Sequence, residues 1–144
     1  MANLATHHGF GGDGRRVRLT KNDRLVLTAL EEAASPLKAY DLLERLKAQG
    51  IGAPMTVYRA LDRLQKQGLV HKLDGLGAFM VCSHGKPHEV ETFLICRKCD
   101  KVEEIEQAPE PLHQLAHDAT DGYDFQADLI RVEIRGMCKD CNLQ

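Results

Sequence analysis

Hydrophobic residues recur at helical spacing in three segments of the N-terminal half. Over residues 26–34 every third or fourth position is apolar, and Ser35-Pro36 follows, which predicts that a first helix ends there. Residues 39–46 repeat the pattern. A third segment begins at Pro54, whose missing N–H costs nothing in a first helical turn, and Gly68 supplies a C-terminal cap. We therefore predict three amphipathic helices.

Two short strands are expected next, at residues 69–73 and 78–81, because both are apolar and β-prone. The Asp74-Gly75-Leu76-Gly77 stretch between them has the chemistry of a hairpin turn. Three helices followed by a β-hairpin is the element order of a winged helix, in which the third helix reads DNA.

The C-terminal half mixes strands with one helix. Strands are expected at 92–95, 102–105 and 130–134, the last because apolar and charged residues alternate. Two prolines, Pro109 and Pro111, introduce a helix with an apolar stripe. The predicted fold class is α+β, with an N-terminal winged helix and a small α/β domain. The predicted division is a flexible tail (1–15), a winged helix (16–82), a linker (83–90) and an α/β domain (91–144).

Net charge is distributed unevenly along the 144 residues. The overall value of -2 combines 11 basic and 7 acidic residues in 1–70 with 8 basic and 14 acidic residues in 71–144. The basic half is a candidate for contact with phosphate, although chance variation of a solvated surface would look the same. No apolar run approaches the ~20 residues of a membrane span, and residues 1–14 lack the apolar core of a signal peptide. We expect a cytoplasmic protein with no membrane partner.

Four of the five cysteines form two Cys-x-x-Cys pairs, Cys96 with Cys99 and Cys138 with Cys141. Two intervening residues let both thiolates of a pair reach one ion, and two such pairs complete a tetrahedron. The pattern predicts a closed structural zinc site that attaches the C-terminal strand to the central hairpin. The alternative is a redox switch made of four thiols.

The fifth cysteine, Cys82, ends the predicted hairpin. His71, His84 and His88 lie nearby in the sequence, and Glu104 lies near the first cysteine pair. Nitrogen, sulfur and oxygen ligands drawn from both domains would form an interdomain site that senses metal by fixing domain orientation. The alternative is that His71 is an ordinary hairpin residue and Cys82 a small buried hydrophobe.

Polar residues of the third helix are candidates for DNA contact. Arg59 can bind guanine or phosphate in a fork, and Thr56 and Tyr58 can donate to phosphate or touch a thymine methyl. An ordinary polar helix face would carry similar residues. His113 and His117, four residues apart on the later helix, are more consistent with a solvated face than with a metal site.

Several motifs resemble the ferric-uptake-regulator family. The segments are Arg18-Leu19-Thr20, Ala39-Tyr40-Asp41-Leu42-Leu43, Thr56-Val57-Tyr58-Arg59-Ala60-Leu61, the two cysteine pairs and residues 102–104. The resemblance covers about residues 16 to 141. It implies a homodimer, with 91–144 as the dimerisation domain, that binds double-stranded operator DNA when loaded with metal. The DNA-binding residues it implies are Arg18, Tyr40, Thr56, Tyr58 and Arg59.

Within the family, the linker resembles that of the zinc-uptake regulators. Iron and peroxide sensors carry a His-His-x-His cluster there, whereas this chain has a single cysteine followed by a proline-containing segment. Carried over by position, a regulatory zinc would be held by His71, Cys82, His88 and Glu104, with His84 as a rival to His88. Sulfur suits zinc better than iron(II) or manganese.

Two departures from the family pattern matter. Thr20-Lys21-Asn22-Asp23 replaces the Thr-x-Gln-Arg motif of many members. Leu129 or Ile130 stands where iron-sensing members carry a histidine, which argues against a third metal site.

The sequence thus predicts a zinc-responsive repressor of zinc uptake genes, with one structural and one regulatory zinc per subunit. The alternatives are a family regulator that senses iron, manganese or peroxide, and a thiol redox sensor or zinc store without DNA binding. An enzyme is not expected, because the chain lacks the His-x-Glu and Pro-Cys-x-x-Cys motifs of zinc deaminases. No small organic substrate is predicted.

Overall fold

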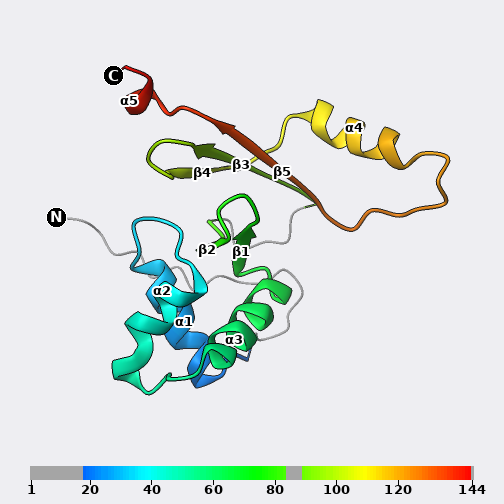
Figure 1. Cartoon of the computed structure of the whole chain (residues 1–144). Coiled ribbons are helices and arrows are strands. Elements are labelled where there is room, and N and C mark those ends of the chain that lie inside the picture. The colour runs from blue at the N-terminus through cyan, green and yellow to red at the C-terminus, as the bar shows by residue number, and fades with distance from the viewer. Residues whose placement is uncertain (1–17, 84–88, 144) are drawn as a thin grey trace.

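The computed structural model describes residues 18–83 and 89–143. The predicted tail, residues 1–15, lies outside these ranges. Three helices and a hairpin form the N-terminal part (Figure 1). Their bounds are α1 Lys21–Glu31, α2 Ala39–Leu46, the 3-10 helix η1 Lys47–Gln49, α3 Pro54–Lys66, β1 Val70–Leu73 and β2 Ala78–Val81.

The helix boundaries follow the local chemistry of the sequence. Pro54 occupies the first turn of α3, as predicted. Gly68 has a left-handed φ of 70° just after α3, and Gly50 has a φ of 94° after η1, so both end their helices without the steric penalty of a side chain. The apolar stripes of the three helices form one core, whose most deeply buried members are Val26, Leu42, Leu46, Val57, Ala60, Leu61 and Leu64.

The hairpin β1–β2 is antiparallel, with Val70 opposite Val81 and Leu73 opposite Ala78. A backbone bridge between Leu37 and Phe79 ties β2 to the segment that precedes α2. Three helices followed by a hairpin confirm the winged-helix order.

A three-stranded sheet follows, in the order β4-β3-β5. Strands β3 and β4 are antiparallel, and β3 and β5 are parallel. The segment between β4 and β5, which contains α4, carries the chain from one edge of the sheet to the other, past β3. The bounds are β3 Val90–Cys96, β4 Val102–Ile105, α4 Glu110–Thr120, β5 Ile130–Gly136 and α5 Lys139–Asn142. The mixed helix-and-sheet fold is therefore as predicted, apart from the short elements η1 and α5, which the sequence did not predict.

The hairpin contacts the sheet directly. Leu73 of β1 is buried with Phe93 and Ile95 of β3 in a second hydrophobic cluster. The Glu133 carboxylate of β5 accepts hydrogen bonds from the backbone N–H groups of Asp74 (2.8 Å) and Gly75 (3.0 Å) in the hairpin turn. Elements on both sides of the predicted linker are thus in contact. The exact domain boundaries stay a prediction.

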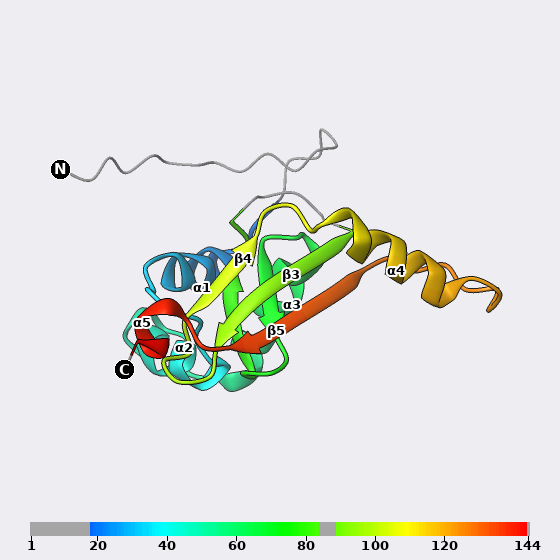
Figure 2. The ribbon, with the colours of Figure 1, turned by 90° about the horizontal axis from the view of Figure 1, so that it is seen from above.

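Helix α4 carries the predicted apolar stripe, but the stripe is not buried in this chain. None of its residues is buried, and Leu115 is 65% exposed. Figures 1 and 2 show α4 extending away from the end of the sheet. No helix among the described residues is long and apolar enough to cross a membrane.

Candidate metal centres

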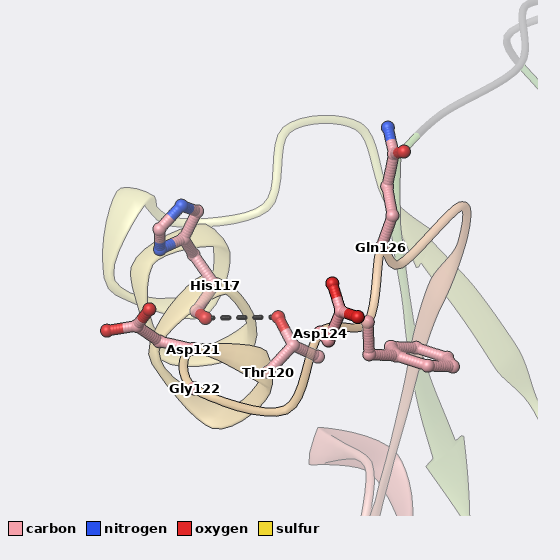
Figure 3. Close-up of a pocket in the computed structure, with 7 residues that line it drawn as sticks. His117, Thr120, Asp121, Gly122, Asp124 and Gln126 are labelled. Carbon is pink, nitrogen blue, oxygen red and sulfur yellow. Dashed lines mark hydrogen bonds between the residues drawn. The ribbon is translucent and has the colours of Figure 1, made fainter.

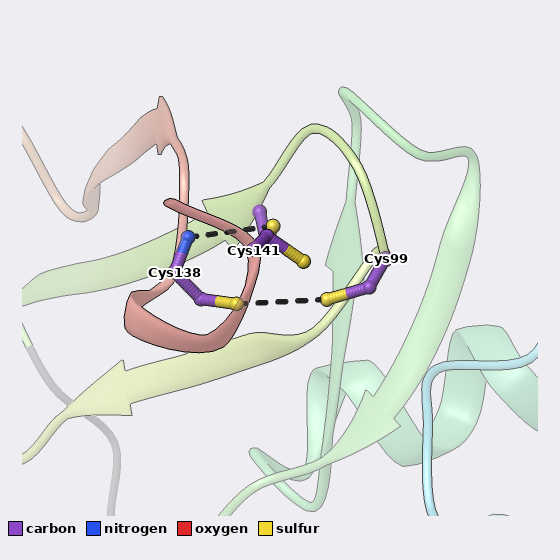
Figure 4. A group of neighbouring side chains, drawn as sticks. Cys99, Cys138 and Cys141 are labelled. Carbon is purple, nitrogen blue, oxygen red and sulfur yellow. Dashed lines mark hydrogen bonds between the residues drawn. The ribbon is translucent and has the colours of Figure 1, made fainter. Parts of the chain in front are cut away.

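The four paired cysteines come together next to the C-terminal ends of β3 and β5. Figure 4 shows Cys99, Cys138 and Cys141 of this cluster. Cys96 ends β3, and Cys99 follows in a tight turn that closes with Asp100 in the left-handed region (φ 56°). Cys138 precedes α5 and Cys141 lies within it. The sequence prediction that both pairs meet is confirmed.

The sulfur spacing fits a tetrahedral metal and not a disulfide. None of the five cysteines forms a disulfide. The four sulfurs of this cluster lie within 4.8 Å of one another, and Cys99 Sγ is 3.8 Å from Cys138 Sγ. Zinc–sulfur bonds of ~2.3 Å at tetrahedral angles place two sulfurs ~3.8 Å apart, whereas a disulfide requires about 2.05 Å. The cluster is therefore able to hold a metal ion.

The electrostatics of the four thiols also favour a cation. Backbone N–H groups of Cys138, Cys99 and Lys98 lower the pKa of Cys96 to about 6. The hydrogen bond with Cys138, together with burial, raises the pKa of Cys141 to about 12. One thiolate is thus stabilised by the protein itself, but four cannot ionise at such spacing without a positive charge among them.

A second cluster of potential ligands lies between the hairpin and the sheet. It contains His71 from β1, Cys82 just after β2 and Glu104 from β4, and their ligand atoms lie within 4.8 Å of one another. The backbone N–H of Cys82 donates to Leu69 O (2.9 Å), which fixes the end of the hairpin. The structure brings three of the four predicted regulatory ligands together. The fourth, His88, and its rival His84 lie outside the described residues.

The orientation of the His71 ring fits a role as a metal ligand. Its side chain is buried, and Nε2 lies 3.2 Å from Glu104 Oε1. Within the described part of the chain, however, Nε2 makes no hydrogen bond of acceptable geometry. A buried imidazole nitrogen that faces a carboxylate and a thiol without a good hydrogen bond is what a metal site requires. The ring is further fixed by an edge contact with Phe93, at a centroid distance of 5.2 Å.

Glu104 is held as an anion. Burial opposes its ionisation, but the adjacent His71 imidazole and hydrogen bonds from Ser83 lower the pKa of Glu104 to about 2. Ser83 donates to Glu104 Oε2 from both its backbone N–H (3.1 Å) and its hydroxyl (2.6 Å). Sequence analysis missed Ser83, and its position directly after Cys82 is the only signal that could have indicated it.

His71 is strongly basic in this arrangement. Burial disfavours the imidazolium, but the close approach of Cys82, Glu104 and Glu91 outweighs it and raises the pKa of His71 to about 11. A cation is therefore favoured at this position, and a metal ion would have to displace a proton from Nε2.

The residues expected to contact DNA are all exposed or partly exposed. Tyr40 is at the start of α2 and is 69% exposed, and Tyr58 on α3 is 51% exposed. Arg18 and Arg59 are exposed, and Thr56 is partly exposed. Both tyrosines therefore present most of their side chains to solvent. The contacts with DNA stay predictions.

Arg63, another polar residue of α3, has a structural role. Its Nε and Nη2 donate to Asp23 Oδ1 (2.9 and 2.7 Å), which joins α3 to α1. Asp23 in turn completes a capping box with Thr20. The Thr20 to Asp23 segment departs from the family motif, yet it still caps the helix.

A shallow hollow lies at the C-terminal end of α4 (Figure 3), lined by residues between His117 and Gln126. It is formed by one local stretch of mostly exposed side chains, and the hydroxyl of Thr120 donates to His117 O (3.1 Å). The His117 side chain is 80% exposed. A solvated face, as expected, describes it better than a metal site.

A winged helix joined to a small sheet with a four-cysteine cluster defines a class of metal-binding DNA-recognition proteins. The ferric uptake regulator family model matches residues 14–135. The chain therefore belongs to the ferric uptake regulator family, whose members are transcription regulators.

Among solved structures, the crystal structure of holo XcZur is 37% identical and covers 90% of this chain and 90% of that chain, with a TM-score of 0.79. A zinc uptake regulator complexed with zinc and DNA is 31% identical over 88% of this chain and 85% of its own, with a TM-score of 0.77. The Helicobacter pylori ferric uptake regulator Fur is 18% identical over 88% of this chain and 83% of its own, with a TM-score of 0.57, and shares the fold. A search of curated protein sequences finds no match.

Proposed function

We propose that this chain is a zinc-responsive repressor that binds operator DNA as a zinc-loaded dimer and controls zinc uptake genes. The observation that carries this proposal is the His71–Cys82–Glu104 cluster between the hairpin and the sheet, where the buried Nε2 makes no good hydrogen bond among the described residues. The likeness to holo XcZur and to a zinc uptake regulator bound to zinc and DNA supports it.

The four-cysteine cluster would hold the structural zinc. Four thiolates close the tetrahedron and leave no position for water or substrate, so this metal would stabilise the fold and not catalyse a reaction. Its binding energy would be folding energy, on the order of 10 kcal/mol. We therefore infer that the protein is not an enzyme.

Zinc at the second cluster would act by selecting one arrangement of hairpin and sheet. Cys82 and His71 belong to the hairpin, and Glu104 belongs to the sheet. A ligand shifts a conformational equilibrium only through its different affinity for the two states. An ion that needs donors from both elements binds the closed arrangement far better. In a dimer, that arrangement would set the spacing of two recognition helices.

A second copy of the chain is the proposed partner along α4. The solvent-facing apolar side chains there include Leu115 of α4 and Phe125, Leu129 and Ile134 in the segment that leads into β5 and in β5 itself. Exposed apolar groups along α4, the following segment and β5 are what an association surface would offer. Family membership supports a homodimer.

Zinc is proposed over iron(II) and manganese because one donor is sulfur. Thiolates favour soft and borderline ions, while carboxylate-rich sites suit harder ones. A regulator of iron, manganese or peroxide response stays the alternative, as does a thiol redox sensor that does not bind DNA.

The decisive experiment measures operator binding by the purified protein at buffered free Zn, Fe(II) and Mn(II), in the presence of reducing agent. We expect zinc to support binding at the lowest free concentration. The Cys82→Ser variant should keep its four-cysteine zinc and its dimeric state. It should require at least tenfold more free zinc for DNA binding, about 1.4 kcal/mol.

The control is His117→Ala, which alters an exposed histidine outside both clusters and should behave as wild type. If Cys82→Ser binds DNA at the wild-type zinc concentration, the regulatory site is wrong. DNA binding that is driven equally by Fe(II) would favour the iron-sensing alternative. For the fourth ligand, His88→Ala should be as damaging as Cys82→Ser and His84→Ala nearly silent. The reverse result would exchange their roles.

A further inference from the structure

Glu91 connects His71 to the strand β5. The carboxylate is buried, and Glu91 Oε1 lies 3.1 Å from His71 Nδ1. Its other oxygen, Oε2, accepts hydrogen bonds from Nε (2.9 Å) and Nη2 (2.7 Å) of Arg131. The remaining Nη1 of Arg131 donates to Lys72 O (2.7 Å), the carbonyl next to His71. The four residues form one closed polar network.

We propose that Glu91, held by Arg131, is the positioning residue that orients His71 so that its Nε2 faces the metal position formed with Cys82 and Glu104. This inference rests on the proposed zinc site and adds to it a residue that does not touch the metal.

Glu91 acts through the other nitrogen of the ring. A neutral imidazole has one N–H donor and one lone pair, and the partner of the donor decides which nitrogen is left to bind a metal. A carboxylate at Nδ1 keeps the proton there and leaves the lone pair on Nε2. It also makes the imidazole a stronger ligand, because negative charge behind the ring increases electron density on Nε2.

Glu91 is not itself a ligand in this arrangement. Both of its oxygens are engaged, one by His71 and one by Arg131, and they lie on the Nδ1 side of the ring. The three potential ligand atoms lie on the Nε2 side. Glu91 and Glu104 therefore flank the imidazole in different roles, although both are acidic residues of the same sheet.

Arg131 extends the network to the strand that leads to the second cysteine pair. It lies opposite Glu91 in the parallel β3–β5 register. By donating to both Glu91 and Lys72 O, the guanidinium fixes the carboxylate relative to the backbone of β1. The orientation of the His71 ring thus depends on a residue 60 positions later in the sequence.

The test is the zinc affinity of the second site, measured by chelator competition on the full-length dimer that keeps its four-cysteine zinc. Glu91→Gln keeps the shape but loses the charge, and Glu91→Ala also removes the acceptor. Each variant should lower the affinity of the second site for zinc by about 10- to 100-fold, while a saturating zinc concentration still fills the site. Arg131→Met should weaken it in the same direction, and Arg131→Lys should restore part of the affinity. The control, Glu103→Ala, removes an exposed carboxylate of β4 and should leave the affinity unchanged.

A second measurement separates positioning from simple destabilisation. In the zinc-loaded wild type, nitrogen-edited NMR should show the His71 Nδ1 proton as a slowly exchanging signal. Glu91→Gln should weaken and Glu91→Ala abolish that protection. If Glu91→Ala fails to fold, the zinc affinity and the Nδ1 proton signal of Glu91→Gln test the positioning role.

The outcomes distinguish this inference from the zinc site itself. If Cys82→Ser loses the second zinc while both Glu91 variants bind it within threefold of wild type, the positioning role is wrong and the site stands. If a folded Glu91→Ala protein binds no second zinc at any concentration, Glu91 is a ligand and the role is again wrong. If Cys82→Ser keeps the second zinc at wild-type affinity, the proposed site itself is wrong, whatever Glu91 does.

Discussion

Replacing Asp23 should destabilise the helical part of the protein more than any exposed acidic residue does. The Asp23 side chain is fully buried. Oδ1 accepts two hydrogen bonds from Arg63, and Oδ2 accepts one from the backbone N–H of Thr20 (2.8 Å). The Thr20 hydroxyl accepts from the Asp23 N–H (3.1 Å), so one residue caps α1 and attaches it to α3.

The cost of Asp23→Ala can be assembled from these contacts. Loss of a helix cap costs about 1 kcal/mol, and loss of hydrogen bonds to a charged group costs about 1.5–3 kcal/mol. The Arg63 side chain is 40% exposed, so water can solvate the guanidinium again and the lower part of that range applies. We expect the free energy of unfolding to fall by about 2–3 kcal/mol.

The contribution of Asp23 should also depend on pH. Burial raises the pKa of Asp23, but hydrogen bonds from Arg63 and Thr20 outweigh it, so the folded-state pKa lies below the ordinary value of 3.8. A carboxyl with a lowered pKa stabilises the fold fully above the unfolded pKa and loses that effect as pH falls through the folded pKa. The stability difference between wild type and Asp23→Asn should be constant from pH 7 to about 5 and shrink below pH 3.8. Effects of acid on the cysteine sites cancel in this difference.

The assay is urea denaturation of the full chain, with Asp62→Ala as the matched control. The Asp62 side chain is 60% exposed and pairs with Lys66 on the surface of α3. Such a pair is worth at most about 1 kcal/mol. If Asp23→Ala lowers the free energy of unfolding no more than Asp62→Ala does, the roles of Asp23 in capping α1 and in attaching α1 to α3 are refuted.

Two further predictions concern the other sites. Cys96→Ser or Cys138→Ser removes a thiolate from a closed tetrahedron, so each variant should lose one tightly held zinc and form a weaker dimer. Elemental analysis and sedimentation measure both, and full zinc content in a stable dimer would contradict the assignment. Arg59→Ala and Tyr58→Ala should each weaken operator binding, by about 1–3 kcal/mol for a lost bidentate base contact, with zinc content and dimerisation unchanged. Wild-type affinity in both variants at matched salt would locate the DNA surface elsewhere.

The features that the sequence predicted well depend on local chemistry. Pro54 and Gly68 bound α3 because each has a backbone property that other residues lack. The cysteine pairs could be identified because two residues between thiols is already the geometry of a metal knuckle. His71, Cys82 and Glu104 were grouped by ligand chemistry and family resemblance, and the structure brings them together.

The features that escaped prediction depend on register and on distant partners. Glu91 meets Arg131 only because β3 and β5 are parallel with one particular alignment. A one-residue slip of β5 would move the Arg131 side chain to the other face of the sheet. Arg63 is an ordinary polar helix residue until α1 brings Asp23 beside it. The apolar stripe on α4 was predicted, but its periodicity does not reveal that the stripe is left exposed and does not pack into a core of this chain.

The hairpin β1–β2 is suited to transmit the state of the second cluster to α3, because it belongs to both hydrophobic cores. Val70 and Phe79 pack with the helices, whereas Leu73 packs with Phe93 of the sheet. Only three residues separate the end of α3 at Lys66 from the start of β1. Coupling between two sites needs an element with discrete arrangements that both sites bias. The hairpin meets that condition, because it is short and packs against both cores. It cannot move with the sheet without also moving α3. Under the proposed function, zinc at His71 would therefore act on DNA through the packing of the hairpin against α3.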